Sequence, residues 1–163
     1  MKSKFKFGAY LVVVLSTIFS IMMILSLSVY FFGIAIPIGI YLLLNFWLIL
    51  VGIWLVYGEL RTKVIFVYIG YDLFTVKSYF GLGPSKTWYF NEIDGYLTAI
   101  LPASGGESYE YLYLIKNSKK VIKLSQFYHS NYTDLKNAIS SAGISNLGCE
   151  DFSYSRELKE IFR

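Results

Sequence analysis

The sequence predicts an α+β membrane protein, in which two transmembrane helices form an N-terminal hairpin and a small antiparallel β domain with a capping helix follows. Two observations predict it. Residues 7–57 contain no Asp, Glu, Lys, Arg or His, and after them short apolar segments alternate with turn residues. We therefore expect a hairpin over residues 1–60, a β domain over 61–146 and a C-terminal tail over 147–163.

Composition separates the chain into two parts with different surroundings. Hydrophobic residues make up 55% of it and the mean hydropathy is +0.50, which exceeds what an average soluble domain carries. Lys2, Lys4 and Lys6 supply three of the 15 basic residues, which leaves 12 basic residues against all 11 acidic ones in the rest of the chain. This near-neutral remainder argues against nucleic acid as a partner, because nucleic-acid binding needs a basic face.

The hairpin is predicted from two apolar runs, over residues 8–32 and 38–57, that a turn containing Gly33 and Pro37 separates. Each run is long enough to cross a hydrocarbon core of about 30 Å. A cleaved signal peptide is the alternative for the first run, but such a peptide has a shorter apolar segment and a small-residue cleavage site. We expect both runs to stay in the bilayer.

The charges that flank the runs predict their orientation. Lys2, Lys4 and Lys6 precede the first run, and Arg61 and Lys63 follow the second. Because short cytoplasmic flanks are rich in Lys and Arg, we expect a multi-pass protein of the cytoplasmic (inner) membrane with both termini in the cytoplasm.

Asn45 is the polar side chain within the runs that most needs a partner in lipid. A hydrogen bond to the neighbouring helix is the simpler interpretation, and an oligomer contact or part of a transport path is the alternative. The absence of charge inside the runs argues against transport.

The β domain is predicted from short apolar segments with turns between them. The expected strands cover residues 63–69, 73–80, 86–90, 96–101, 109–116 and 121–125. A helix over about 131–142 follows, with Asn131 as its N-cap and Gly143 at its end. The tail has the pattern of a short amphipathic helix through Tyr154, Leu158, Ile161 and Phe162.

Two segments carry a resemblance to a known family. The strand WYFNEIDGY starts at Trp88, and the run IKLSQFYHSNYTDLK leads from Ile122 into the expected helix. This pattern resembles bacterial pleckstrin-homology-like (PH-like) domains, which often follow a two-span anchor. The resemblance implies a PH-like β-barrel or sandwich that one C-terminal helix caps, in a family whose members mostly lack an assigned activity. Its phosphoinositide-binding forms use basic residues between the first two strands, and Ile69–Asp72 has none there.

A lysine cluster is the first candidate binding site. Lys116, Lys119, Lys120 and Lys123 lie in and beside one expected hairpin. They are candidates for contact with anionic lipid head groups or with a partner, at about 1 kcal/mol per residue near a charged surface. The alternative is a solvated turn whose charges discourage strand pairing at an edge.

A tyrosine stripe is the second candidate. Tyr109, Tyr111 and Tyr113 share one face of an expected strand, since side chains alternate along a strand. Such a stripe suits protein recognition, and packing inside the domain accounts for it equally well.

No residue pattern points to catalysis, a metal or a cofactor. His129 is the one histidine and Cys149 the one cysteine, so neither a histidine cluster nor a disulfide can form, and both residues are expected at the surface. Glu92 and Asp94 are expected in turns, and Gly81–Ser85 is too short for a phosphate loop. We expect no cofactor.

The leading interpretation is a non-enzymatic module, anchored in the lipid bilayer, whose cytoplasmic PH-like domain recognises a protein partner or the membrane surface. One alternative is a membrane-bound immunity protein that neutralises a toxin. Another is an accessory subunit of a larger membrane enzyme or transport complex. The hairpin also leaves room for a homo-oligomer.

Overall fold

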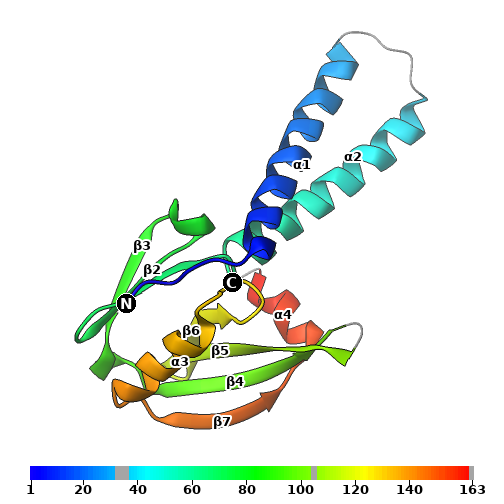
Figure 1. The fold of residues 1–163 in the computed structure, drawn as a ribbon. Coiled ribbons are helices and arrows are strands. Elements are labelled where there is room, and N and C mark those ends of the chain that lie inside the picture. Colours follow the sequence, from blue (N-terminus) through cyan, green and yellow to red (C-terminus); the bar gives the residue numbers. More distant parts are fainter. Residues whose placement is uncertain (32–36, 104–105, 162–163) are drawn as a thin grey trace.

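A helical hairpin rises from a small β domain in the computed structural model, which describes all residues except 32–36, 104–105 and 162–163 (Figure 1). Helix α1 spans Phe7–Phe31 and helix α2 spans Ile38–Ile53, so two long apolar helices are confirmed. A π-helical turn, Trp54–Leu60, continues α2. Both helices are long and apolar enough to cross a membrane. Most of the expected turn between them, Gly33 included, lies outside the described residues.

Asn45 joins the two helices. The Ser26 hydroxyl of α1 donates a hydrogen bond to Asn45 Oδ1 at 2.9 Å, and Asn45 Nδ2 donates to the Tyr41 carbonyl at 2.9 Å. Both halves of the amide therefore have partners within the hairpin. This confirms the interhelical interpretation of Asn45.

The β domain consists, among the described residues, of two sheets. The first sheet has the order β1-β2-β3 and the second the order β6-β5-β4-β7. The strands are β1 Phe66–Ile69, β2 Leu73–Lys77, β3 Ser85–Tyr89, β4 Gly95–Pro102, β5 Ser108–Lys116, β6 Lys119–Ser125 and β7 Asn146–Asp151. Neighbouring strands are antiparallel except β4 and β7, which are parallel.

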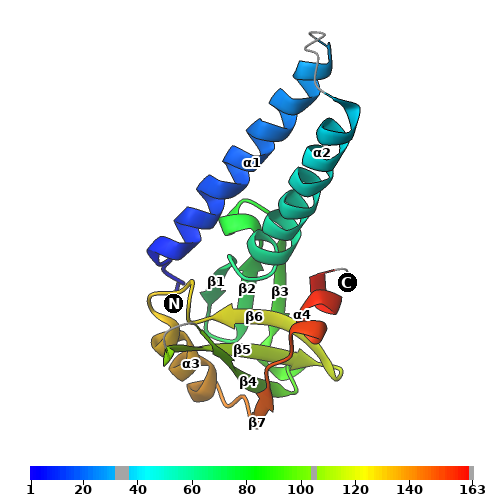
Figure 2. The ribbon, with the colours of Figure 1, turned by 90° about the vertical axis from the view of Figure 1, so that its right-hand side faces the viewer.

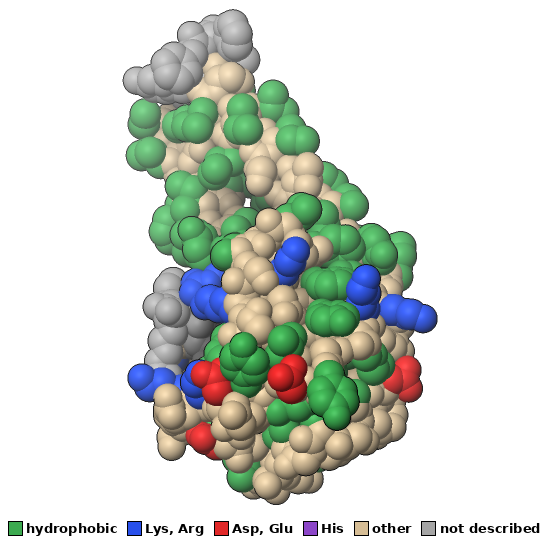
Figure 3. Space-filling model, turned by 90° about the vertical axis from the view of Figure 1, so that its left-hand side faces the viewer, with side chains coloured by type: hydrophobic (Ala, Val, Ile, Leu, Met, Phe, Trp, Pro, Cys, Tyr) green, Lys and Arg blue, Asp and Glu red, His purple; other side chains and the backbone are tan. Residues whose placement is uncertain are grey.

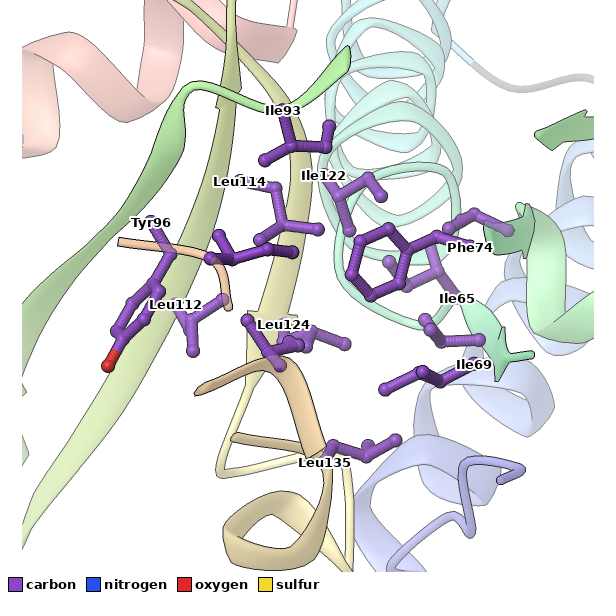
Figure 4. Close-up of a cluster of buried hydrophobic side chains, with 14 of the residues drawn as sticks. Ile65, Ile69, Phe74, Ile93, Tyr96, Leu112, Leu114, Ile122, Leu124 and Leu135 are labelled. Atoms are coloured by element: carbon purple, nitrogen blue, oxygen red, sulfur yellow. The ribbon is translucent and has the colours of Figure 1, made fainter. Parts of the chain in front are cut away.

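The core lies between the inner faces of the two sheets (Figure 4). Phe74 and Ile69 of the first sheet face Leu112 and Leu124 of the second, and all four side chains are buried. Helix α3, Tyr132–Ser141, adds Leu135 to this cluster. Alternating apolar residues on each strand thus face one shared interior, as strand periodicity requires.

The predicted barrel is wrong in one respect, because the two sheets do not close into a barrel. Strand β3 ends the first sheet and β6 ends the second, and no ladder between them occurs in the described chain. Both edges carry lysines, such as Lys86 on β3 and Lys119 and Lys120 on β6. Charged edges discourage strand pairing, so the sandwich stays open at this seam.

Strand β7 was not expected from the sequence. It returns after α3 and pairs in parallel with β4, with Cys149 opposite Thr98. Gly95 makes room for this return, because a Cβ there would lie 2.5 Å from Leu147 Cγ and 2.7 Å from the Ser145 carbonyl oxygen. Helix α4, Tyr154–Ile161, follows β7 and agrees with the expected helical tail, although Phe162 lies outside the described residues.

Residues 1–3 pair with β1 at the edge of the first sheet, and residues 4–6 bond to the segment before α3. The Ser3 N–H donates to the Val67 carbonyl at 2.8 Å, and the Val67 N–H donates to Ser3 Oγ at 2.9 Å. Asn131 does not cap α3 with its side chain; its Oδ1 instead accepts the Lys4 N–H at 2.8 Å. The segment before α1 is therefore fastened both to the first sheet and to the start of α3.

Candidate functional site

A basic cleft lies at the open seam between β3 and β6, next to the end of the second span. Its volume is about 570 Å³. Apolar side chains of the core form part of its lining, among them Val76, Trp88 and Ile122. Figure 3 shows one face of the molecule, on which several basic side chains lie directly beneath the apolar hairpin and others lie lower, beside acidic side chains.

Four of the basic side chains that line the cleft have no carboxylate partner among the described residues. We call them the free cations: Arg61, Lys86, Lys119 and Lys159. They come from four separate elements, because Arg61 caps the π-helical turn, Lys86 lies on β3, Lys119 starts β6 and Lys159 belongs to α4. The fold thus gathers like charges that only a nearby anion would neutralise.

Three further cations line the same cleft and are paired. Lys120 forms an ion pair with Glu150 of β7, and Arg156 Nη1 of α4 lies 3.1 Å from the same carboxylate. Lys123 forms an ion pair with Glu157. Since Glu150 is the one carboxylate of the cleft lining in the described chain, the cleft keeps a strong positive excess. The hydroxyls of Ser78 and Ser118 add neutral groups to its wall.

A second set of charges, which we call the joint, connects the hairpin to the β domain. It consists of Glu59, Lys63, Lys123, Tyr128 and Glu157. Lys63 Nζ lies 2.7 Å from Glu59 Oε1 and 3.7 Å from Glu157 Oε2. The Tyr128 hydroxyl donates to Glu59 Oε2 at 2.6 Å. Hairpin, β6, α4 and the loop before α3 therefore meet in one buried network (Figure 2).

Burial and charge pull the pKa values of the joint in opposite directions. Burial lowers the pKa of Lys63, but the Glu59 carboxylate and other anions beside it outweigh burial and raise it overall. Burial raises the pKa of Glu157, whereas Lys123 and Lys63 outweigh it and hold this pKa below its usual range. Both residues are therefore charged at neutral pH, as a paired network requires.

The structure separates the four lysines of the candidate cluster. Lys119, Lys120 and Lys123 line the cleft, but Lys123 is only 8% exposed and belongs to the joint. Lys116 is outside the lining, and its Nζ lies 2.9 Å from Glu92 Oε1. The four lysines are close in sequence, but the structure places them in three different surroundings: the cleft, the joint and an ion pair outside both.

The tyrosine stripe is largely covered. Tyr111 is 3% exposed and Tyr113 is 2% exposed, and both belong to a small apolar cluster with Phe152. The Tyr113 hydroxyl donates to Glu157 of α4 at 3.1 Å, and burial raises the pKa of Tyr111 to about 12. Tyr109 is partly exposed, with its hydroxyl on Glu107. An open recognition face of three tyrosines is not present in this conformation.

His129 is fully buried, so its expected surface position is wrong. Its Nδ1 lies 2.9 Å from the Ser125 carbonyl oxygen and its Nε2 lies 2.9 Å from that of Ile65. Both ring nitrogens therefore face backbone carbonyl oxygens, and burial lowers the pKa of the ring, whose neutral form donates to one of the two. Cys149 is exposed, as expected. Within the described residues no His, Cys, Asp or Glu cluster that could hold a metal occurs.

The acidic turn residues hold the loops next to β4. Glu92 Oε2 accepts the Tyr89 N–H at 2.9 Å, and Asp94 Oδ2 accepts the Ser118 N–H at 3.1 Å. The interpretation of both as turn residues agrees with these bonds. Neither of them lines the cleft.

Sequence reasoning missed most of the free cations as site residues. Arg61 had a usable signal, because it directly follows an apolar span where a head group would lie. Lys86 and Lys159 had none, since only the packing of β3 and α4 against the seam brings them to Lys119. The cleft can bind an anion through these charges. No family model, curated protein or solved structure matches this chain. The identification of the cleft as a candidate site therefore rests on its geometry alone.

Proposed function

We propose that this chain is a non-enzymatic, membrane-anchored binding module whose basic cleft binds a phosphate-bearing group at the cytoplasmic surface of the membrane. The observation that carries the proposal is the position of the four free cations in one cleft beside the end of α2. Arg61 comes directly after the candidate span Ile38–Leu60, so one wall of the cleft lies at the depth of lipid head groups.

Membrane electrostatics supports this location. The cytoplasmic leaflet is rich in anionic lipids, and each Lys or Arg near its surface gains about 1 kcal/mol. Arg61 can bind a phosphate through two parallel N–H donors, and the lysines act as compact charges beside it. The lysines at the N-terminus lie on the same side as the β domain, which is consistent with a cytoplasmic position of both.

The assignment of the β domain to the PH-like class is part of this proposal. Two stacked sheets followed by the capping helix α3 support it, and the parallel strand β7 departs from it. The proposed ligand does not lie at the turn between the first two strands, because Ile69–Asp72 carries no basic residue. It lies at the seam between β3 and β6.

The test uses the full chain in phosphatidylcholine nanodiscs, titrated with inorganic pyrophosphate in a calorimeter. The variant carries Arg61→Gln, Lys86→Gln and Lys119→Gln, and we expect about 100-fold weaker binding from three contributions of about 1 kcal/mol each. A matched control carries Lys2→Gln, Lys4→Gln and Lys77→Gln, which removes the same charge from exposed positions outside the cleft. Equal loss of affinity in both variants would overturn the proposal.

A second arm identifies the source of the phosphate. The chain is purified from detergent that contains equal amounts of phosphatidylglycerol and phosphatidylcholine, and the bound lipids are measured by mass spectrometry. Enrichment of phosphatidylglycerol that the cleft variant loses and the control keeps indicates a lipid head group. Pyrophosphate binding without enrichment indicates a soluble phosphate compound. If the chain neither binds pyrophosphate nor enriches phosphatidylglycerol, the result contradicts the proposed function.

A further inference from the structure

The loop between β2 and β3, residues 78–84, presents an apolar side chain that the fold of the domain does not need. Leu82 at its tip is 90% exposed, and Pro84 beside it is also exposed. An exposed leucine gains nothing in water, whereas it gains free energy when an apolar phase covers it. We call residues 78–84 the β2–β3 loop.

The loop lies against the first turn of the hairpin. The Phe80 ring stacks on Phe5 with 4.3 Å between ring centroids, and its contact with Tyr10 of α1 is edge-on at 5.1 Å. Tyr10 lies within the candidate span Phe7–Val29. Both ribbon views place the short helical turn of the loop beside the foot of α1 (Figures 1 and 2). The loop therefore reaches the depth at which the hairpin becomes apolar.

The backbone of the loop is held in a costly conformation. Tyr79 has φ of 54° and Phe80 has φ of 59°, values that bulky residues rarely adopt. Gly83 closes the loop where a Cβ would lie 2.7 Å from the Tyr79 ring. The Phe80 N–H donates to the Val64 carbonyl at 2.8 Å, which ties the loop to the segment after the hairpin. Such strain persists only where surrounding contacts impose it.

The surface around the loop continues onto the hairpin as an apolar surface. Phe7 is 81% exposed and Tyr10 is 52% exposed at the foot of α1. Aromatic residues at this position are typical of the membrane interface. Leu82 thus extends a surface that lipid covers if the hairpin spans the bilayer.

We propose that the β2–β3 loop is a second membrane contact, in which Leu82 inserts into the interface of the leaflet that the foot of the hairpin enters. This inference rests on the proposed membrane anchoring, but not on a ligand in the basic cleft. The loop and the hairpin together fix the tilt of the β domain, because the loop adds a lateral contact to the two helices. Lys86 follows the loop on β3, so the same contact holds the cleft against the head groups.

The test measures the depth of single labels in the full chain. In a Cys149→Ser background, Leu82→Cys carries an environment-sensitive fluorophore, in phosphatidylcholine nanodiscs with a phospholipid quencher just beneath the head group. We expect a blue shift and a clear loss of fluorescence. Tyr71→Cys is the matched control, because Tyr71 is 100% exposed in the β1–β2 turn at the other end of the first sheet, and this label is expected to remain unquenched.

A third label, at Ile18→Cys in the middle of α1, reports on the anchor itself, and it is measured in nanodiscs whose quencher is carried deep in the acyl chain, because Ile18 lies far below the head groups if α1 spans the bilayer. Quenching at both Ile18→Cys and Leu82→Cys but not at Tyr71→Cys supports the inference. Quenching at Ile18→Cys with Leu82→Cys as unquenched as Tyr71→Cys overturns the loop contact and leaves the anchor intact. No quenching at Ile18→Cys overturns the anchoring, and the loop inference with it.

Discussion

The free cations of the cleft and the buried charges of the joint differ in exposure and in pairing, although members of both sets lie close together in the same segments. Arg61 lines the cleft and Lys63 lies in the joint, two residues apart. Lys119 is exposed at the start of β6, and Lys123 on the same strand is 8% exposed and pairs with Glu157. Lysine is thus exposed without a carboxylate partner among the described residues at one position, and buried in an ion pair at the other. Burial and a carboxylate partner make the difference.

The two regions also differ in what their charges contribute to stability. Exposed cations contribute little, because water solvates them in the folded and unfolded states alike. A buried ion pair has lost its water, so each charge depends on the other. The comparison therefore predicts large effects of substitution in the joint and small ones in the cleft.

The largest effect is expected from Glu157→Ala. It leaves Lys123 buried without this carboxylate and removes an acceptor from Tyr113. Removal of one partner of a buried pair costs about 3–5 kcal/mol, and we expect α4 to detach from the sheet. Hydrogen exchange of residues 154–161 and thermal unfolding of the full chain in detergent measure the two consequences.

A control separates the loss of the pair from the loss of packing. Glu157→Leu combined with Lys123→Met replaces both charges by apolar groups of similar size, which is close to neutral for many buried pairs. We expect this double variant to recover most of the stability that Glu157→Ala loses. If Glu157→Ala unfolds at the temperature of the unchanged chain, the joint is not a stabilising element.

An intermediate effect is expected from acid. The Glu157 pKa is held below its ordinary value of 4.5, so the unfolded state binds more protons as the pH falls. Its stabilisation is present above about pH 5 and is lost as the pH falls through the folded pKa, by at most about 1.4 kcal/mol per pH unit. The measurement is thermal unfolding of the full chain at about pH 5, 4 and 3, which covers the range in which the carboxylate takes up its proton.

Glu157→Gln removes this dependence in the same experiment. The buried His129 contributes in an earlier window, because its folded pKa lies below its ordinary value of 6.5 and it loses stability from about that pH downwards. Because Glu157→Gln keeps His129, the difference between this variant and the unchanged chain at each pH isolates the carboxylate effect. Equal acid sensitivity of Glu157→Gln and the unchanged chain would assign the loss to other groups.

The sequence predicted those features that local periodicity determines. The apolar runs, the alternation of Phe74 and Val76 in β2 and the face of α3 with Leu135 and Ile139 all agree with the structure. Each depends on residues close together in the chain. The predicted termination of α3 agrees as well, since the helix ends at Ser141 and Gly143, just after the C-cap Ala142, has φ of 77°.

Features that depend on distant residues could not be predicted in this way. Strand β7 has no β-branched residue, and its pairing depends on the space that Gly95 leaves beside β4. The joint brings Glu59 to Tyr128, 69 positions along the chain. Asn131 had a capping pattern, but the N-terminal segment binds its side chain instead. Tertiary contacts outweighed the local preference at each of these positions.

The smallest effect on stability is expected from substitutions in the cleft. This prediction tests most directly whether the cleft and the joint differ. Lys86→Gln and Lys119→Gln remove charges that are exposed and have no carboxylate partner within the described chain, so each is expected to change the free energy of unfolding by less than about 0.5 kcal/mol. Because like charges repel, any change should be a gain, and added salt should reduce it. Thermal unfolding at low and high salt is the measurement. A loss as large as that of Glu157→Ala would mean that these lysines belong to the structural network, and the distinction between cleft and joint would not hold.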